Sequence, residues 1–439
     1  MQHDHEDTHR GGKFKLKIRH VILVIFAALL IAGILHLALL SSGANRRIEA
    51  LRATGQPTSL AELALQNKLP MGVDNAAPLY QGAFGAYASP AADVNVPFVG
   101  KKTVPLPRGT VLAEPMAQVV ADCLAANEKC LALLHQAAGV ETCRYDYDYH
   151  KMNPDLSNLR SCGQLLKLAV VHHACKGDSE AVVSCIEDSL ALGDSLRREP
   201  LLMPYLVHMG CSGLTITALE WALNLTTFTD PQLRELSDAL AAAGERIDLT
   251  YAMTTERCSM IECVRDPSLV ATGMEARVLK LPGVRSQGLI DILDHMESCV
   301  QAAGLPPMQR MAKFDEIETR IQGLSVVHIA AKMLTPAIAR ISVLDSRAHA
   351  HLDLAGTGLA IERYRLVNGK LPEQLTDLVP AYLAEVPIDP FDGQLIRYRR
   401  TEPGYLLYSI SDDCEDNGGK ERDEVGKGER YDLCFIVTR

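Results

Sequence analysis

An acidic stretch near the C-terminus, SDDCEDNGGKERDE at residues 411–424, is the first candidate for chemistry. Between Asp412 and Glu424 it holds seven acidic and two basic residues. Such a cluster suits a catalytic centre, an ion site or a solvated loop. Calcium takes about six to eight oxygen ligands from carboxylates and loop carbonyls, and a bound dication would relieve the repulsion among the acids. The residues alone leave these three alternatives open.

Other polar clusters give weaker indications. The sequence holds no G-x-S-x-G, Walker loop, dinucleotide-binding glycine loop or H-E-x-x-H motif. His349, His351 and Asp353 suggest a metal site, but residues two apart on a helix diverge by about 200°. The alternating segment YDYDYH at 145–150 places three tyrosines on one face. That face suits carbohydrate or protein contact, or it packs as an ordinary segment between helices.

The bulk composition bounds the class of protein. A chain of 439 residues exceeds one usual core, so we expect at least two domains. The net charge of -10 argues against nucleic acid as a partner, because phosphate binding needs a concentrated basic surface. Aromatic residues make up 5% of the chain, and alanine and leucine are abundant. The composition therefore predicts a mainly α-helical fold.

One long apolar segment predicts a membrane anchor. Residues 21–40, VILVIFAALLIAGILHLALL, carry no charged side chain. As a helix they span about 30 Å, which matches the hydrocarbon core of a bilayer. A cleaved signal peptide is the alternative, but its apolar region is usually shorter, about 7 to 15 residues. More basic residues precede the segment than follow it, so we expect a cytoplasmic N-terminus: Arg10, Lys13, Lys15, Lys17 and Arg19 against Arg46, Arg47 and Arg52.

The cysteines agree with an extracytoplasmic body in which disulfides persist. Ten of the twelve lie between Cys123 and Cys299, and the remaining two are Cys414 and Cys434. Both counts are even, which permits pairing within each region. No C-x-x-C spacing occurs, so the sequence predicts neither a zinc ribbon nor a thioredoxin-like pair.

Hydrophobic periodicity locates the main elements. Stripes over residues 159–173 and 182–196, joined at Gly177-Asp178, predict an antiparallel helical hairpin. A further stripe over 341–366 predicts a long helix that ends at Asn368-Gly369. QLIRYRR, YLLYSI and YDLCFIV then predict three strands of a small antiparallel sheet.

The C-terminal residues carry a resemblance to a known family. The order IERYRLVNGKLPEQLTDLVPAYLAEVPIDPFDGQLIRYRR, GYLLYSISDD and YDL resembles the head of the major pseudopilin of type II secretion systems. It covers about residues 355–437. A pseudopilin joins its apolar helix directly to the head, whereas some three hundred residues intervene here. The whole plan is also similar to uncharacterised membrane-anchored proteins of planctomycete-type bacteria.

The resemblance implies a calcium site in the loop after the second strand. Carried over by position, Asp413 matches the loop aspartate and Asp432 the aspartate of the closing strand, with Asp416 as an added candidate. Cys414 stands where the family often has glycine, and the loop is long. A disulfide between Cys414 and Cys434 could close the loop with or without the ion.

The sequence thus predicts a mainly α chain with an N-terminal transmembrane helix, an irregular domain of helical hairpins and a pseudopilin-like α+β head. The expected parts are a cytoplasmic tail (1–19), the anchor (20–41), a connector with short helices (42–112), the helical domain (113–334), and the long helix with the head (335–439).

We expect a single-pass protein with its bulk outside the cytoplasm, in the periplasm, which binds or scaffolds another envelope protein. A secretion or pilus-associated component that docks to pseudopilins is the alternative. An enzyme ranks third, and a deep pocket holding paired histidine and acidic groups would favour it.

Overall fold

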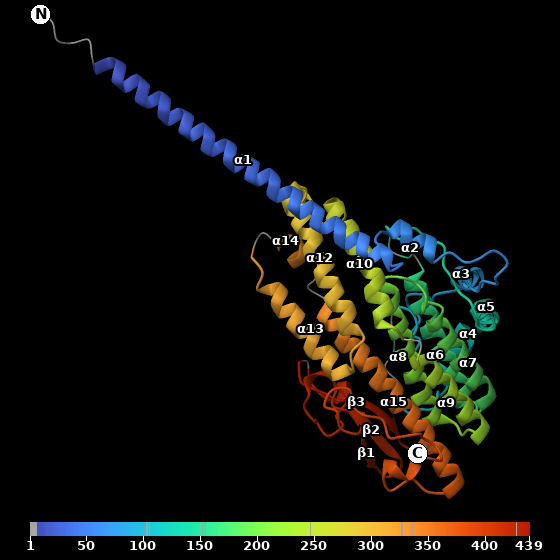
Figure 1. Cartoon of the computed structure of the whole chain (residues 1–439). Coiled ribbons are helices and arrows are strands. Elements are labelled where there is room, and N and C mark those ends of the chain that lie inside the picture. The colour runs from blue at the N-terminus through green and yellow to red at the C-terminus, as the bar shows by residue number, and fades with distance from the viewer. Residues whose placement is uncertain are drawn as a thin grey trace, which may run out of the picture.

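The computed structural model describes residues 7–439 apart from 102–103, 105, 152, 154, 246, 326–327, 335–337 and 427. Side chains are described from residue 20 onward, except those of 334 and 339. Within this part the chain is mainly helical, with a small antiparallel sheet near its C-terminus (Figure 1). The predicted mainly α fold with a small antiparallel sheet is confirmed at this level.

The helices are α1 (Asp7–Ala53), α2 (Leu60–Gln66), α3 (Ala77–Ala86), α4 (Met116–Ala126), α5 (Glu128–Ala138), α6 (Leu156–Cys175), α7 (Ser179–Asp194), α8 (Leu202–Leu225), α9 (Asp230–Glu245), α10 (Leu249–Arg265), α11 (Gly273–Leu279), α12 (Pro282–Ala303), α13 (Pro307–Gln322), α14 (Ile329–Leu334) and α15 (Ile338–Asn368). Short 3-10 turns include η1 (Pro267–Leu269) and η4 (Ser411–Asp413). The strands are β1 (Arg397–Arg400), β2 (Tyr405–Ser409) and β3 (Leu433–Val437), in the order β1-β2-β3.

Helix α1 is much longer than the apolar segment that predicted it. Its N-terminal half projects from the body, and the apolar residues there are exposed (Figure 1). Its C-terminal half lies along α12, with Ala44 and Ile48 buried and Leu37 and Leu40 half-buried. This spacing of three to four residues places one stripe of α1 against the body. The expected connector from residue 42 therefore begins as a continuation of the same helix.

The second long apolar helix, α8, is a core helix. It is long and apolar enough to cross a membrane, but neighbouring helices bury most of its apolar residues. α8 packs against α6, and α6 packs against α7 as the predicted antiparallel hairpin. Trp221 of α8 is buried in the core, with its ring edge-on to Phe98.

The long helix α15 belongs to two cores. Its first residues, Ile338 and Ile341, pack with buried side chains of α10, α12 and α13. Farther along, Leu359 and Ile361 share a core with α8, α9 and the sheet. The head therefore packs against the helical body and shares a hydrophobic core with it (Figure 1).

Side chains of α8 cover the outer edge of strand β3. The Glu220 carboxylate accepts a hydrogen bond from the Ile436 N–H at 2.6 Å, and the Asn224 amide donates to the Ile436 carbonyl at 2.8 Å. Asn224 also accepts from the Thr438 N–H at 2.7 Å. These contacts satisfy backbone groups that an edge strand would otherwise leave unpaired.

An ion pair between the half-buried Arg108 and the buried Glu220 supports this edge. Arg108 Nε lies 3.2 Å from the Glu220 carboxylate, and the same guanidinium donates to Glu421 in the loop before β3. Burial raises the pKa of Glu220 to about 7, and Arg108 opposes that shift. The connector after α3, helix α8 and the head thus meet at one cluster.

A close contact of α15 with β3 gives the first testable prediction. A Cβ atom at Gly358 would lie 2.6 Å from the ring of Phe435, which is fully buried. We expect Gly358→Ala to lower the free energy of unfolding by about 1 to 3 kcal/mol, because overpacking forces strain on a filled core. Urea denaturation of the full chain in detergent measures the change.

Gly356 provides the matched control on the same helix. A Cβ there meets nothing within 4 Å. We expect Gly356→Ala to be neutral or to stabilise by up to about 1 kcal/mol, because alanine loses less conformational entropy in a helix. Equal destabilisation by the two substitutions would contradict the proposed packing of Phe435 against α15.

Candidate functional site

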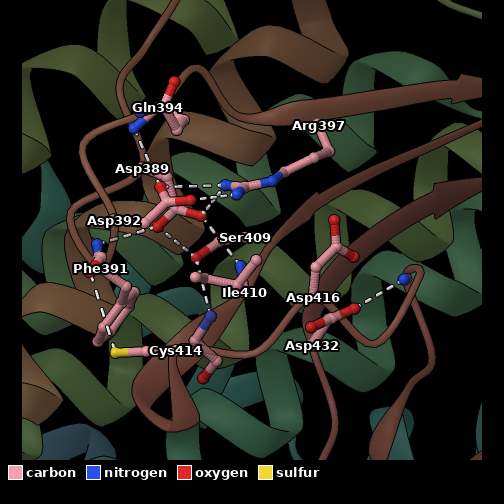
Figure 2. Close-up of polar contacts among 12 residues, drawn as sticks. Asp389, Phe391, Asp392, Gln394, Arg397, Ser409, Ile410, Cys414, Asp416 and Asp432 are labelled. Atoms are coloured by element: carbon pink, nitrogen blue, oxygen red, sulfur yellow. Dashed lines mark hydrogen bonds and ion pairs between the residues drawn. The ribbon is translucent and has the colours of Figure 1, made fainter.

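The turn D-P-F-D-G at 389–393 holds the most completely bonded carboxylate of the head (Figure 2). Asp389 is fully buried. One oxygen accepts from the Phe391 N–H at 3.1 Å and from the Ser409 hydroxyl at 2.9 Å. The other accepts from the Ile410 N–H at 2.9 Å and from the Arg397 guanidinium at 2.6 Å.

Arg397 joins the two aspartates of this turn. Its guanidinium also bonds both carboxylate oxygens of Asp392. Although burial opposes the shift, this contact lowers the pKa of Asp392. The four donors around Asp389 come from the turn, from β1 and from the end of β2, so the carboxylate fastens these segments together. Because hydrogen-bond donors of the protein contact both of its carboxylate oxygens, Asp389 stabilises the fold.

The predicted calcium residues surround the short segment Asn417–Gly419. Asp432 is buried and accepts from the Gly419 N–H at 2.7 Å and the Asn417 N–H at 3.3 Å. Asp416 accepts from the Gly418 N–H at 2.8 Å, and Asp413 accepts from the Asn417 side-chain amide at 3.2 Å. Burial and the charge of Asp416 raise the pKa of Asp432. Amide donors therefore already serve each of the three carboxylates.

These three carboxylates are not gathered into a metal centre. Across the described part of the chain, no group of three or more His, Cys, Asp or Glu side chains is placed to hold a metal ion. Calcium binding by Asp413, Asp416 and Asp432 stays a prediction.

All twelve cysteines are free thiols. Cys414 is exposed and its thiol contacts the Phe391 carbonyl, whereas Cys434 is buried and its thiol contacts the Asp432 carbonyl. Burial and the nearby carboxylates of Glu421 and Glu220 raise the pKa of the Cys434 thiol. For the Cys414 thiol, the pKa is raised by burial and by the carboxylates of Asp413 and Asp389. The two thiols thus have different surroundings, and no disulfide joins them in this structure.

The tyrosine segment at 145–150 is a packing segment. Its alternation holds, because Tyr145 is buried and Tyr147 and Tyr149 are half-buried while the residues between them are exposed. The Tyr145 hydroxyl lies 3.0 Å from the Ser195 hydroxyl, and Tyr149 bonds the Asn67 side chain at 2.7 Å. The tyrosine rings therefore do not form an open binding face.

A polar cavity of about 570 Å³ lies between α5, α7 and α9. The His135 imidazole and the buried Asp188 carboxylate face each other there at 3.1 Å. Burial raises the pKa of Asp188, and His135 opposes the shift. A second hollow on α9, also about 570 Å³, shares Glu187 and Ala239 with the first, so the two form one groove.

Acidic side chains dominate this surface, which we call the acidic groove. Its acids are Glu141, Glu187, Asp188, Asp194, Asp230, Glu235 and Asp238, and its basic side chains are His135, Arg197 and Arg234. Burial and the neighbouring Glu235 carboxylate raise the pKa of Glu187. This repulsion means that a bound cation would stabilise the charged form of these carboxylates. The helices that line the groove, α5, α7 and α9, lie on the opposite side of the body from α13 and α14 (Figure 1).

The groove does not present an activated nucleophile among its described lining residues. Burial raises the pKa of the Cys143 thiol to about 12, so the thiol stays protonated at neutral pH. The Ser195 hydroxyl donates to the Leu192 carbonyl at 2.7 Å. The paired histidine and acidic groups that would favour an enzyme are present in this cavity as His135 and Asp188.

No single motif of the sequence indicates the acidic groove, because its acids come from separate helices. A usable signal was the pair Glu187-Asp188, which lies within the helical segment 182–196 beside its apolar stripe. His135 lies more than fifty residues away, and only the packing of α5 on α7 brings it to Asp188.

Comparison with known protein families, with curated proteins and with solved structures gives no match.

The Asp389 cluster yields a test of its role in the fold. We expect Asp389→Asn to lower the free energy of unfolding by about 3 kcal/mol or more, because it removes the charge that partners a largely buried guanidinium. Urea denaturation of the full chain reports the loss.

Asp392→Asn is the comparison, since the Asp392 side chain is 25% exposed and has fewer buried partners. We expect a smaller loss, of about 1 kcal/mol, typical of a partly solvated ion pair. If the two variants had equal free energies of unfolding, Asp389 would not stabilise the turn more than Asp392 does.

Proposed function

We propose that this chain is a single-pass membrane protein that acts by binding, with the acidic groove as the site for a basic segment of another envelope protein. The observation that carries the proposal is the groove itself, an open surface lined by seven carboxylates against three basic side chains. An open groove of this charge suits Lys and Arg side chains of an extended partner, because opposite potentials steer and orient association.

The anchor part of the proposal rests on α1. Its apolar residues from Val21 to Leu35 are exposed, and the same helix continues into a buried stripe on α12. A helix of this composition is unfavourable in water and favourable in a bilayer. A continuous helix also holds the body at a fixed distance from the membrane. The excess of basic residues before the span supports a cytoplasmic N-terminus.

The likeness of the head to pseudopilins is part of this proposal. It is supported by a long helix packed on a three-stranded antiparallel sheet, in the order that the sequence pattern implies. α15 is also contacted by α8, α9 and α13. Because its surface is covered by these helices, a binding or scaffolding role suits the head better than assembly into a filament through α15.

The anchor gives a prediction for intact cells. We expect the protein to remain with membranes after alkaline carbonate extraction, because an apolar span of this length inserts stably. Protease added to spheroplasts is expected to degrade the body and spare residues 1–19. Release by carbonate, or a body that stays intact while the N-terminal tail is cleaved, would contradict the proposed topology.

The groove gives a prediction in solution. We expect a fluorescent hexalysine peptide to bind the full chain in detergent and to dissociate as salt is raised, since salt screens exposed charges. The triple variant Glu187→Gln, Asp188→Asn, Glu235→Gln removes three attractions of about 0.5 kcal/mol each, so affinity should fall about tenfold. Fluorescence anisotropy measures the binding.

The matched control removes the same charges elsewhere. Glu128→Gln, Asp315→Asn, Glu316→Gln changes three exposed acids outside the groove. We expect hexalysine to bind this variant as it binds the unmodified protein. Equal loss in the two triple variants would show attraction to net charge alone, and the groove would lose its assigned role.

A further inference from the structure

The end of the body from which α1 projects carries a group of exposed apolar side chains. We call this group the collar, and it consists of Leu269 and Val270 at η1, Met274 of α11, Leu281 before α12 and Met333 of α14. Met274 is 70% exposed and Leu281 is 53% exposed. These segments are brought together by packing, because Val270, Leu279, Arg285 and Met333 line one small hollow.

The contacts between α1 and α12 indicate which residues of α1 lie beside the collar. Gly43 lies against Ile290, and Arg47 pairs with Asp294 at 2.7 Å, so α1 and α12 run in the same direction. Pro282, the first residue of α12, is eight residues before Ile290, which corresponds to about 12 Å of helix. The same step back from Gly43 reaches Leu35.

Leu35 belongs to the apolar segment 21–40, so the first turn of α12 overlaps the end of that segment. The half-buried Leu37 and Leu40 agree with this overlap, because the body begins to cover α1 there. Figure 1 shows α12 and α14 at the end of the body beside α1. If residues 21–40 fill the hydrocarbon core, the collar meets the lipid interface.

The charges around the collar suit the same surface. Arg277, Lys280 and Arg285 are exposed on α11 and α12 or next to them. The acids close to them are Asp266, which lies 4.0 Å from Lys280, and Glu275. Apolar side chains bordered by basic ones are typical of protein segments that lie in the interface of an anionic bilayer.

We propose that the collar inserts into the interface of the bilayer that α1 crosses, with Arg277, Lys280 and Arg285 on anionic phospholipid headgroups. The proposal rests on the proposed function, because it needs α1 to span that membrane. A single helix would leave the body free to swing about the membrane normal. The second contact fixes its tilt, and it holds the acidic groove clear of the lipid on the opposite side of the body.

Tryptophan quenching by brominated lipids tests the contact. The full chain carrying Leu281→Trp is reconstituted into vesicles of phosphatidylcholine and phosphatidylglycerol, with or without bromine on the acyl chains. The native Trp221 is buried in the core, so the unmodified protein supplies the background. We expect brominated lipid to remove most of the emission that Leu281→Trp adds. Met274→Trp is the second variant, in case Leu281→Trp disturbs folding.

Leu366→Trp is the matched control, because Leu366 is 51% exposed near the far end of α15. Its added emission should be unaffected by bromine. Equal, unquenched emission from both collar variants in vesicle-bound protein would overturn the collar contact and leave the anchor in place. A blue shift at the collar without quenching would indicate a second copy or another protein there, and would also overturn it.

Two further outcomes distinguish the membrane anchor, the collar contact and the role of the three basic residues. Protein that fails to float with the vesicles would overturn the membrane anchor and the collar together. Replacing phosphatidylglycerol by phosphatidylcholine should weaken the quenching of Leu281→Trp, whereas unchanged quenching would remove the role assigned to the three basic residues.

Discussion

The covered edge of strand β3 is the constraint on which the arrangement of the body depends. A three-stranded sheet has two edges, and an unpaired edge exposes backbone donors and acceptors. Here Glu220 and Asn224, one helical turn apart on α8, bond the outward groups of β3. Because Glu220 is buried, it also needs a positive partner, and Arg108 supplies it from the connector. One carboxylate therefore ties three distant segments of the chain together.

This constraint explains why the head and the helical region share their cores. α15 packs against α13 at one end and against β3 at the other, and α8 lies between the sheet and the hairpin of α6 and α7. The body is thus continuous from the segment beside the anchor to the sheet. In our proposal, that continuity lets two contacts with the membrane set the position of a groove on the other side of the molecule.

Several elements could be read from the residues alone, because they depend on local patterns. The stripes over 159–173 and 182–196 became α6 and α7, and YLLYSI and YDLCFIV became the central and outer strands. The candidate sites were harder to predict from the residues alone. Asp413, Asp416 and Asp432 do lie around one short segment, and an amide donor bonds at least one oxygen of each carboxylate. The acidic groove was missed, because its acids come from separate helices.

By itself the sequence determined the helical class, the exposed apolar span and the order of helix and strands in the head. These features depend on composition and on periods of two or 3.6 residues, which are local properties. Only the tertiary structure decided that α1 continues onto α12, that His135 faces Asp188, and that Cys414 and Cys434 stay apart. Such pairings depend on which faces of distant segments pack together, and no local period encodes that choice.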